Sequence, residues 1–260
     1  MRVMLIVSAL LIAAASPTMA ETRSEDAPAD ASTPAIDADL FGVLARATER
    51  AEAFAEARYA FTAERTVRDK DDEAATFTAE FDPRREEDGY WRLIAPTPEE
   101  ADKKVRKALK RMNKRDGGDE ALVYDGMSDL RGIELVEDGP ETAIFASRDL
   151  GDDAPEGKLE ARLFLDKAGG YISKIEVRTI DSFKPLPIVK IKELLQVQEY
   201  AAPVGDGPAL LVRSSSRTVG SAAFRSFEMN EETTFTDIRA VDAPPREKDD
   251  EDDSEEDDES

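Results

Sequence analysis

The sequence predicts an α+β protein in which two helices cover the concave face of a single large, curved antiparallel sheet. Two segments in the first half of the chain have the apolar spacing of amphipathic helices. From residue 132 to residue 241, short runs of alternating apolar and charged residues are separated by turn signals, which is typical of antiparallel strands with one buried face. The chain has no cysteine, so packing alone must hold these elements together.

The first 20 residues are predicted to be a cleavable secretory signal peptide. Arg2 gives a short positive start, Val3 to Ala15 is apolar except for Ser8, and small residues precede a cut after Ala20. The apolar run is shorter than the ~20 residues of a membrane-spanning helix, although an uncleaved anchor is the alternative. Without a cysteine, no lipid can be attached at a mature amino terminus. We therefore expect a periplasmic protein that is not lipid-anchored.

Two further segments are expected to be disordered because they are polar and acidic. Residues 21–36 are rich in Ala, Pro, Ser and acids, and residues 244–260 form an acidic tail. The net charge of the whole chain is −23. Such a charge repels nucleic acid and keeps the protein soluble, so we expect a monomer without a nucleic-acid partner. The folded domain is expected to span residues 37–243.

The chain contains neither histidine nor cysteine. This absence excludes the usual nucleophile–base pairs and the usual ligands of zinc. A pair of carboxylates could still catalyse glycoside hydrolysis, but the sequence offers no motif for one. We therefore expect no enzyme, no cofactor and no metal site.

The elements of the first half follow from the period of the apolar residues. A helix is expected to begin near Asp37, with an apolar stripe at Leu40, Leu44, Ala47, Ala51 and Phe54. Alternation then predicts strands through 59–63 and 77–81, joined at residues 69–72, and a third strand over 90–95.

A second helix is predicted to start at Thr97, which can cap it, with Pro98 in its first turn and Glu100 completing a capping box. Its buried stripe comprises Ala101, Val105, Ala108, Leu109 and Met112. Residues 122–130 are expected to form a short helical turn. Strands follow near 132–137, 141–147, 157–166, 171–180, 187–200, 208–218 and 223–241.

Several segments carry a family resemblance: residues 81–83 (FDP), 89–93 (GYWRL) and 96–99 (PTPE), and the final segments 190–200, 210–212 and 231–242. Through these segments and the order of its elements, the chain resembles the LolA/LolB-like superfamily of outer-membrane lipoprotein carriers. The resemblance is strongest to uncharacterised exported bacterial members. The resemblance implies an open half-barrel of about 10–11 strands over residues 37–243, with helices on the concave face. It also implies binding of apolar ligands or of partner proteins, without catalysis.

One candidate site is an apolar cavity between the sheet and the helices that would accept an acyl chain. Its predicted wall consists of the large apolar residues Phe61, Phe77, Phe81, Trp91, Leu93, Leu109, Met112, Ile175 and Val177. The alternative is that the same side chains fill an ordinary core, because periodicity does not distinguish the wall of a cavity from the filling of a core.

The second candidate site is a basic patch on the second helix. Eight cations lie there within thirteen residues: Lys103, Lys104, Arg106, Lys107, Lys110, Arg111, Lys114 and Arg115. The patch could be a solvated helix face, or it could bind anionic lipid head groups, an acidic partner protein or the chain's own acidic tail.

The sequence thus predicts a periplasmic, non-catalytic binding protein that holds or transfers an apolar or lipidic ligand or a lipoprotein. The alternative is a protein-interaction or structural module with a filled core, acting through its basic helix and acidic tail. Lipid that co-purifies with the protein would distinguish the two.

Overall fold

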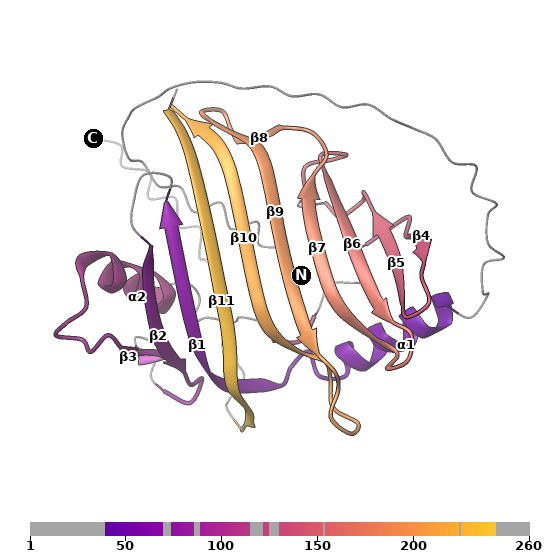
Figure 1. Ribbon diagram of the computed structural model, residues 1–260, viewed down its shortest axis with the longest axis horizontal. Coiled ribbons are helices and arrows are strands. Elements are labelled where there is room, and N and C mark those ends of the chain that lie inside the picture. Colours follow the sequence, from indigo (N-terminus) through magenta and orange to yellow (C-terminus); the bar gives the residue numbers. More distant parts are fainter. Residues whose placement is uncertain are drawn as a thin grey trace, which may run out of the picture.

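The computed structural model describes residues 40–69, 74–85, 89–114, 122–124, 130–152, 154–223 and 225–242. The predicted signal peptide, the lead-in 21–36 and the tail 244–260 lie outside these residues. The described residues form two helices and one 11-stranded antiparallel sheet that curves and does not close (Figure 1). The predicted α+β fold with an open, curved sheet is therefore confirmed.

The chain begins with α1 (Leu40–Glu52), β1 (Arg58–Asp69), β2 (Ala75–Phe81), β3 (Trp91–Ala95) and α2 (Lys103–Lys114). It continues as strands: β4 (Glu134–Asp138), β5 (Thr142–Ser147), β6 (Leu159–Asp166), β7 (Tyr171–Thr179), β8 (Phe183–Leu186), β9 (Val189–Ala201), β10 (Leu210–Ala222) and β11 (Arg225–Val241).

The strand order is β3-β2-β1-β11-β10-β9-β7-β6-β5-β4, and β8 pairs with β9 outside this path. Most neighbours are joined in sequence, as hairpin connections favour. There are two exceptions. β7 pairs with β9 although β8 lies between them in the chain. β1 pairs with β11, in a register that runs from Arg58 opposite Val241 to Asp69 opposite Met229. The last strand, β11, therefore joins the two halves of the sheet. The edge strands of the sheet are β3 and β4.

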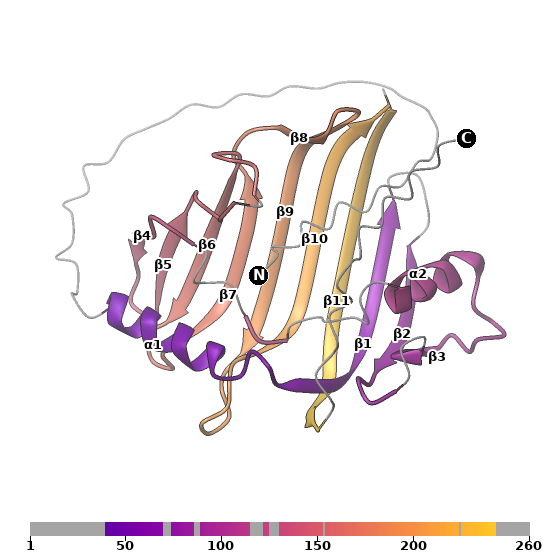
Figure 2. The same cartoon turned by 180° about the vertical axis from the view of Figure 1, so that it is seen from behind.

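Both helices pack on one face of the sheet, which we call the inner face. The apolar stripe of α1 is confirmed, since Leu40, Leu44, Ala47 and Ala51 are all buried. Figure 2 shows α1 running across the ends of the strands on the side of β7, whereas α2 lies beside β2 and β3. The two helices thus cover opposite parts of the inner face.

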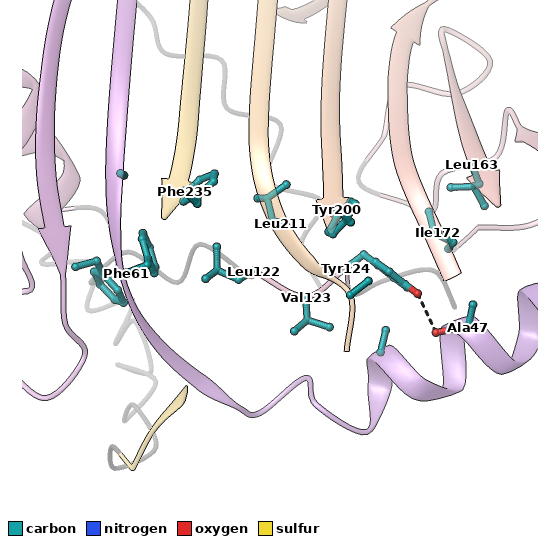
Figure 3. Close-up of a cluster of buried hydrophobic side chains, with 14 of the residues drawn as sticks. Ala47, Phe61, Leu122, Val123, Tyr124, Leu163, Ile172, Tyr200, Leu211 and Phe235 are labelled. Atoms are coloured by element: carbon teal, nitrogen blue, oxygen red, sulfur yellow. Dashed lines mark hydrogen bonds between the residues drawn. The ribbon is translucent and has the colours of Figure 1, made fainter. Parts of the chain in front are cut away.

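The main core lies between these helices and the inner face (Figure 3). Residues 122–124 are buried in it and run between α1 and β10. The carbonyl of Leu122 accepts a hydrogen bond of 2.7 Å from the backbone N–H of Leu211, and the Tyr124 hydroxyl donates one of 3.0 Å to the carbonyl of Ala47. These long-range bonds replace local helical ones, so the prediction of a helical turn is wrong for these three residues.

The start of the second helix also differs from the prediction. Thr97 and Glu100 do pair, since Thr97 Oγ1 donates to Glu100 Oε2 at 2.8 Å, but they close only one turn. The helix itself begins at Lys103, where Asp102 Oδ1 accepts from the backbone N–H of Val105 at 2.8 Å. Asp102 is therefore the N-cap, a position that its short acidic side chain suits.

Candidate functional site

An open groove of about 510 Å³ lies between the edge strand β3 and α2. This volume falls within the range of about 300–1,000 Å³ that is typical of small-molecule sites. The lining residues come from the strand, the turn before the helix and the helix itself: Trp91, Arg92, Leu93, Pro98, Glu99, Arg106 and Leu109. Figure 2 shows how α2 lies beside the end of the sheet that β3 forms.

The strand forms the apolar wall of the groove through alternation. Trp91 and Leu93 point to the inner face and are 4% and 7% exposed, whereas Arg92 between them lies on the outer face. On the opposite side, α2 buries Val105 and Met112 in the core and leaves Leu109 half-buried at the groove. The groove therefore exists because the apolar stripe of α2 packs against the edge strand β3 and extends beyond this strand.

The two arginines of the groove differ in how far they are already paired. Arg92 Nη2 donates to Glu80 Oε2 at 2.9 Å, and Glu80 also pairs with Arg85 and, at 3.6 Å, with Arg239. The hydrogen bond from Arg85, with the charges of Arg85 and Arg92, lowers the pKa of the Glu80 carboxyl. Arg92 is thus part of an ion-pair network on the outer face.

Among the described residues, the guanidinium of Arg106 has one weak hydrogen-bond partner. Its Nη2 donates to the backbone carbonyl of Glu99 at 3.3 Å, and no carboxylate of the described part of the chain lies within ion-pair distance of it. A guanidinium group has five N–H donors, so most of those of Arg106 can reach a ligand. Glu99 is the one acidic residue among the described residues that line the groove with it.

The structure brings together three of the nine predicted cavity residues. Trp91, Leu93 and Leu109 line the groove. The others do not: Phe61, Phe77, Phe81 and Met112 lie in the core behind it, and Ile175 and Val177 lie half-buried on β7, several strands away.

The core behind the groove is packed with aromatic rings. The centroid of the Phe61 ring lies 5.1 Å from that of Phe81, 5.5 Å from that of Trp91 and 5.4 Å from that of Phe235. These distances are those of rings in direct contact. The inner face at this point is therefore filled, and the assignment of the nine residues to a single cavity stays a prediction.

One of the eight predicted basic residues, Arg106, lines the groove. Its neighbours on α2 are exposed and extend the positive charge along the helix: Lys103, Lys104, Lys107, Lys110 and Arg111. The side chain of Lys114 and all of Arg115 lie outside the described residues. The two candidate sites, which the sequence suggested separately, thus meet at Arg106 and Leu109.

The middle of the inner face is polar, which sequence reasoning missed. Register places Ser214 opposite Gln198 and Ser216 opposite Gln196, and Arg65 forms an ion pair with Glu231 on the same face. All of these side chains are half-buried. On β10 the three serines at 214–216 are consecutive, so periodicity does not show which of them face inward. On β9 the apolar Val197 lies between Gln196 and Gln198, so alternation alone would place the glutamines on the outer face. An apolar ligand would find a better match in the groove than on this band.

Two further features restrict the chemistry of the described residues. They contain no group of three or more acidic side chains placed to hold a metal ion. Neither of their helices has the length and apolar character needed to cross a membrane.

No protein-family model matches the sequence, and no curated protein matches it. The chain is similar in structure to a LolA superfamily protein from Nitrosomonas europaea, with 10% sequence identity and a TM-score of 0.37. The similarity covers 77% of this chain and 94% of that one.

Proposed function

We propose that this protein is an exported, non-catalytic binding protein that holds an apolar or lipidic ligand in the groove between α2 and β3. The observation that carries the proposal is the lining of the groove. Trp91, Leu93 and Leu109 give it an apolar wall next to the charged rim of α2. Ligand sites commonly combine such walls with a few polar groups that fix orientation.

The proposed location in a bacterial periplasm rests on the sequence. The charged start, the apolar stretch and the small residues before position 21 are those of a cleaved secretory signal. Transport of a bound ligand through the periplasm is the activity that such a protein would supply.

The absence of catalysis is supported by the ionisable groups at the groove. The described residues that line it include two arginines and one acidic residue, Glu99. Hydrolysis by carboxylates requires two acids facing one another across the substrate. The groove is therefore suited to holding a ligand rather than to transforming it.

The alternative function is that of a protein-interaction module with a filled core. The ring contacts around Phe61 favour this alternative for the concave face, because they leave that part of the inner face packed. In that case the exposed cations of α2 would dock an acidic partner. The groove is the observation that favours a small apolar ligand instead.

Trp91 allows a direct test, because it is the only tryptophan of the chain and lines the groove. A dibrominated stearyl alcohol should quench its fluorescence in a saturable titration, since bromine quenches an indole on contact. Leu109→Glu should abolish the quenching. Ile188→Glu should leave it unchanged, because Ile188 is an exposed residue in the distant turn between β8 and β9.

The interaction module predicts a different result. Neither the alcohol nor an acyl chain with any other head group would quench Trp91 in a saturable manner. Mass spectrometry of an organic extract of the purified protein would then show no co-purifying lipid. Both results together would overturn the proposed function.

A further inference from the structure

The charge around the groove is positive although the whole chain is strongly acidic. The helix α2, with the sequence KKVRKALKRMNK, carries cations and no acid along its entire length. Lys103 and Lys110 lie one turn before and one turn after Arg106, on the same side of the helix. Glu99 is the one acidic residue among the described residues that line the groove, and the cations of α2 outnumber it. A cleft whose charges are mainly of one sign raises the local concentration of ions of the opposite sign. The groove should therefore attract an anion.

Arg106 is the cation best placed to bind that anion. Arg92 also lines the groove, but its guanidinium is already paired with Glu80 on the outer face. Within the described part of the chain, the Arg106 guanidinium has only the 3.3 Å hydrogen bond that it donates to the carbonyl of Glu99. Its remaining donors can form a bidentate pair with a carboxylate or a phosphate, which is the geometry that a guanidinium favours.

The apolar wall lies next to this cation. Trp91, Leu93 and Leu109 line the same groove as Arg106, so a ligand that fills it contacts both kinds of surface. The indole Nε1–H of Trp91 is buried and has no hydrogen-bond partner in the described part of the chain. The carboxylate of Glu99 acts in the opposite direction to Arg106, because it repels an anion in the groove.

We infer that the ligand of the groove is an anionic amphiphile, an acyl chain with a carboxylate or phosphate head group. Arg106 binds the head group, and the chain lies against Trp91, Leu93 and Leu109. This inference rests on the proposed function and names the ligand class of the same site. It also assigns opposite roles to two neighbouring side chains, since Arg106 attracts the head group and Glu99 opposes it.

The test compares ligands that differ only in charge, with Trp91 quenching as the measurement. Dibrominated stearic acid should bind about tenfold more tightly than dibrominated stearyl alcohol at low salt, since one charge-assisted contact is at stake. Vesicles of phosphatidylglycerol with brominated chains, compared with vesicles of brominated phosphatidylcholine, show whether a membrane lipid or a free acid supplies the anion.

Variants then assign the charge preference to single residues. Arg106→Gln should remove the difference between acid and alcohol while the alcohol binds as before. Glu99→Gln should strengthen binding of the acid several-fold. Arg111→Gln is the matched control, because Arg111 is exposed on the same helix and does not line the groove. Circular dichroism and the thermal midpoint of each variant check that the fold is retained.

Each outcome separates the inference from the proposed function. Equal affinity for acid and alcohol would overturn the inference and leave the proposed function standing. Equal losses in the Arg106 and Arg111 variants would also overturn it, because the preference would then arise from the helix as a whole. Quenching by neither ligand, together with the absence of co-purifying lipid, would overturn both proposals.

Discussion

The side-chain amide of Asn113 on α2 forms hydrogen bonds with both the backbone N–H and the backbone carbonyl of Trp91 on β3. Asn113 Oδ1 accepts from the Trp91 N–H at 2.9 Å, and Asn113 Nδ2 donates to the Trp91 carbonyl at 3.2 Å. Trp91 lies on an edge strand, whose outer backbone groups have no neighbouring strand. Asn113 thus forms the two backbone hydrogen bonds to Trp91 that a further strand would form. It also connects α2 to β3, the two elements that line the groove.

Replacement of Asn113 by alanine should destabilise the protein because both backbone groups of Trp91 lose their partner. We expect the free energy of unfolding to fall by about 1–3 kcal/mol, as for other buried polar groups left without a hydrogen bond. Urea unfolding followed by circular dichroism measures this change. Lys110→Ala on the exposed face of the same helix is the control and should have little effect. Equal losses in the two variants would show that helix propensity, rather than the amide pair, is responsible.

Asp82 should make the stability depend on pH. The hydrogen bond from Arg84 lowers the pKa of its carboxyl from 3.8 to about 2, against an opposing effect of burial. A carboxyl whose pKa is lower in the folded than in the unfolded protein stabilises the folded state at pH values above its unfolded-state pKa. This contribution is lost as the pH falls through the folded-state pKa.

We therefore expect Asp82→Asn to lower the free energy of unfolding at pH 7 by about 1 kcal/mol, a modest value because Arg84 is half exposed. The difference from the unmodified protein should shrink as the pH falls from about 4 towards 2. Urea unfolding of both proteins at a series of pH values measures this difference in the free energy of unfolding. Asp206→Asn, in an exposed turn, should show no such trend. A constant difference across the series would mean that the carboxylate charge is not the cause.

Gly220 should not tolerate a side chain. A Cβ atom at this position would lie 2.5 Å from the backbone carbonyl oxygen of Lys190 and 2.7 Å from the ring of Phe227. Since the first contact is with backbone, the strands β9 and β10 would have to move apart. We expect Gly220→Ala to lower the free energy of unfolding by about 1–3 kcal/mol, in the range of overpacked sites. Gly89→Ala, where a Cβ meets nothing within 4 Å, is the control. Similar stabilities in urea would contradict the prediction.

The sequence predicted most of the strands because alternation of apolar and polar residues is a local property. β6 is an example, since Leu159, Ala161, Leu163 and Leu165 are all buried on one face. β8 was missed because Pro185 interrupts it and removes a backbone donor. It is correspondingly short and pairs with β9 alone.

The candidate site was predicted only in pieces because it depends on which elements meet. Arg106 and Leu109 were assigned to two different sites, and Asn113 was assigned to none. Helical spacing shows that Leu109 belongs to an apolar stripe, but not that this stripe extends past the edge of the sheet. The pairing of Asn113 with Trp91 joins residues 22 positions apart, a contact that no local pattern indicates.

Phe61 connects the core to the groove, because its ring contacts that of Trp91 from the buried side. Phe61→Ala should lower the free energy of unfolding by about 3–5 kcal/mol, as for other large-to-small changes in a core. Phe61→Leu should cost less and leave a folded protein in which the indole of Trp91 has lost one edge contact. In that variant we expect the fluorescence maximum of Trp91 to shift to longer wavelength, and brominated ligands to bind more weakly.

The control for Phe61 is Phe41, whose ring packs edge-on against Phe145 but is 43% exposed. Phe41→Leu should change neither the emission of Trp91 nor the affinity for a ligand, since it lies on α1, away from the groove. If Phe61→Leu weakened the protein in urea while the affinity stayed unchanged, the wall of the groove would not depend on the core behind it. The ring cluster would then serve the fold alone, because Trp91 would be held in place by Asn113 and β2.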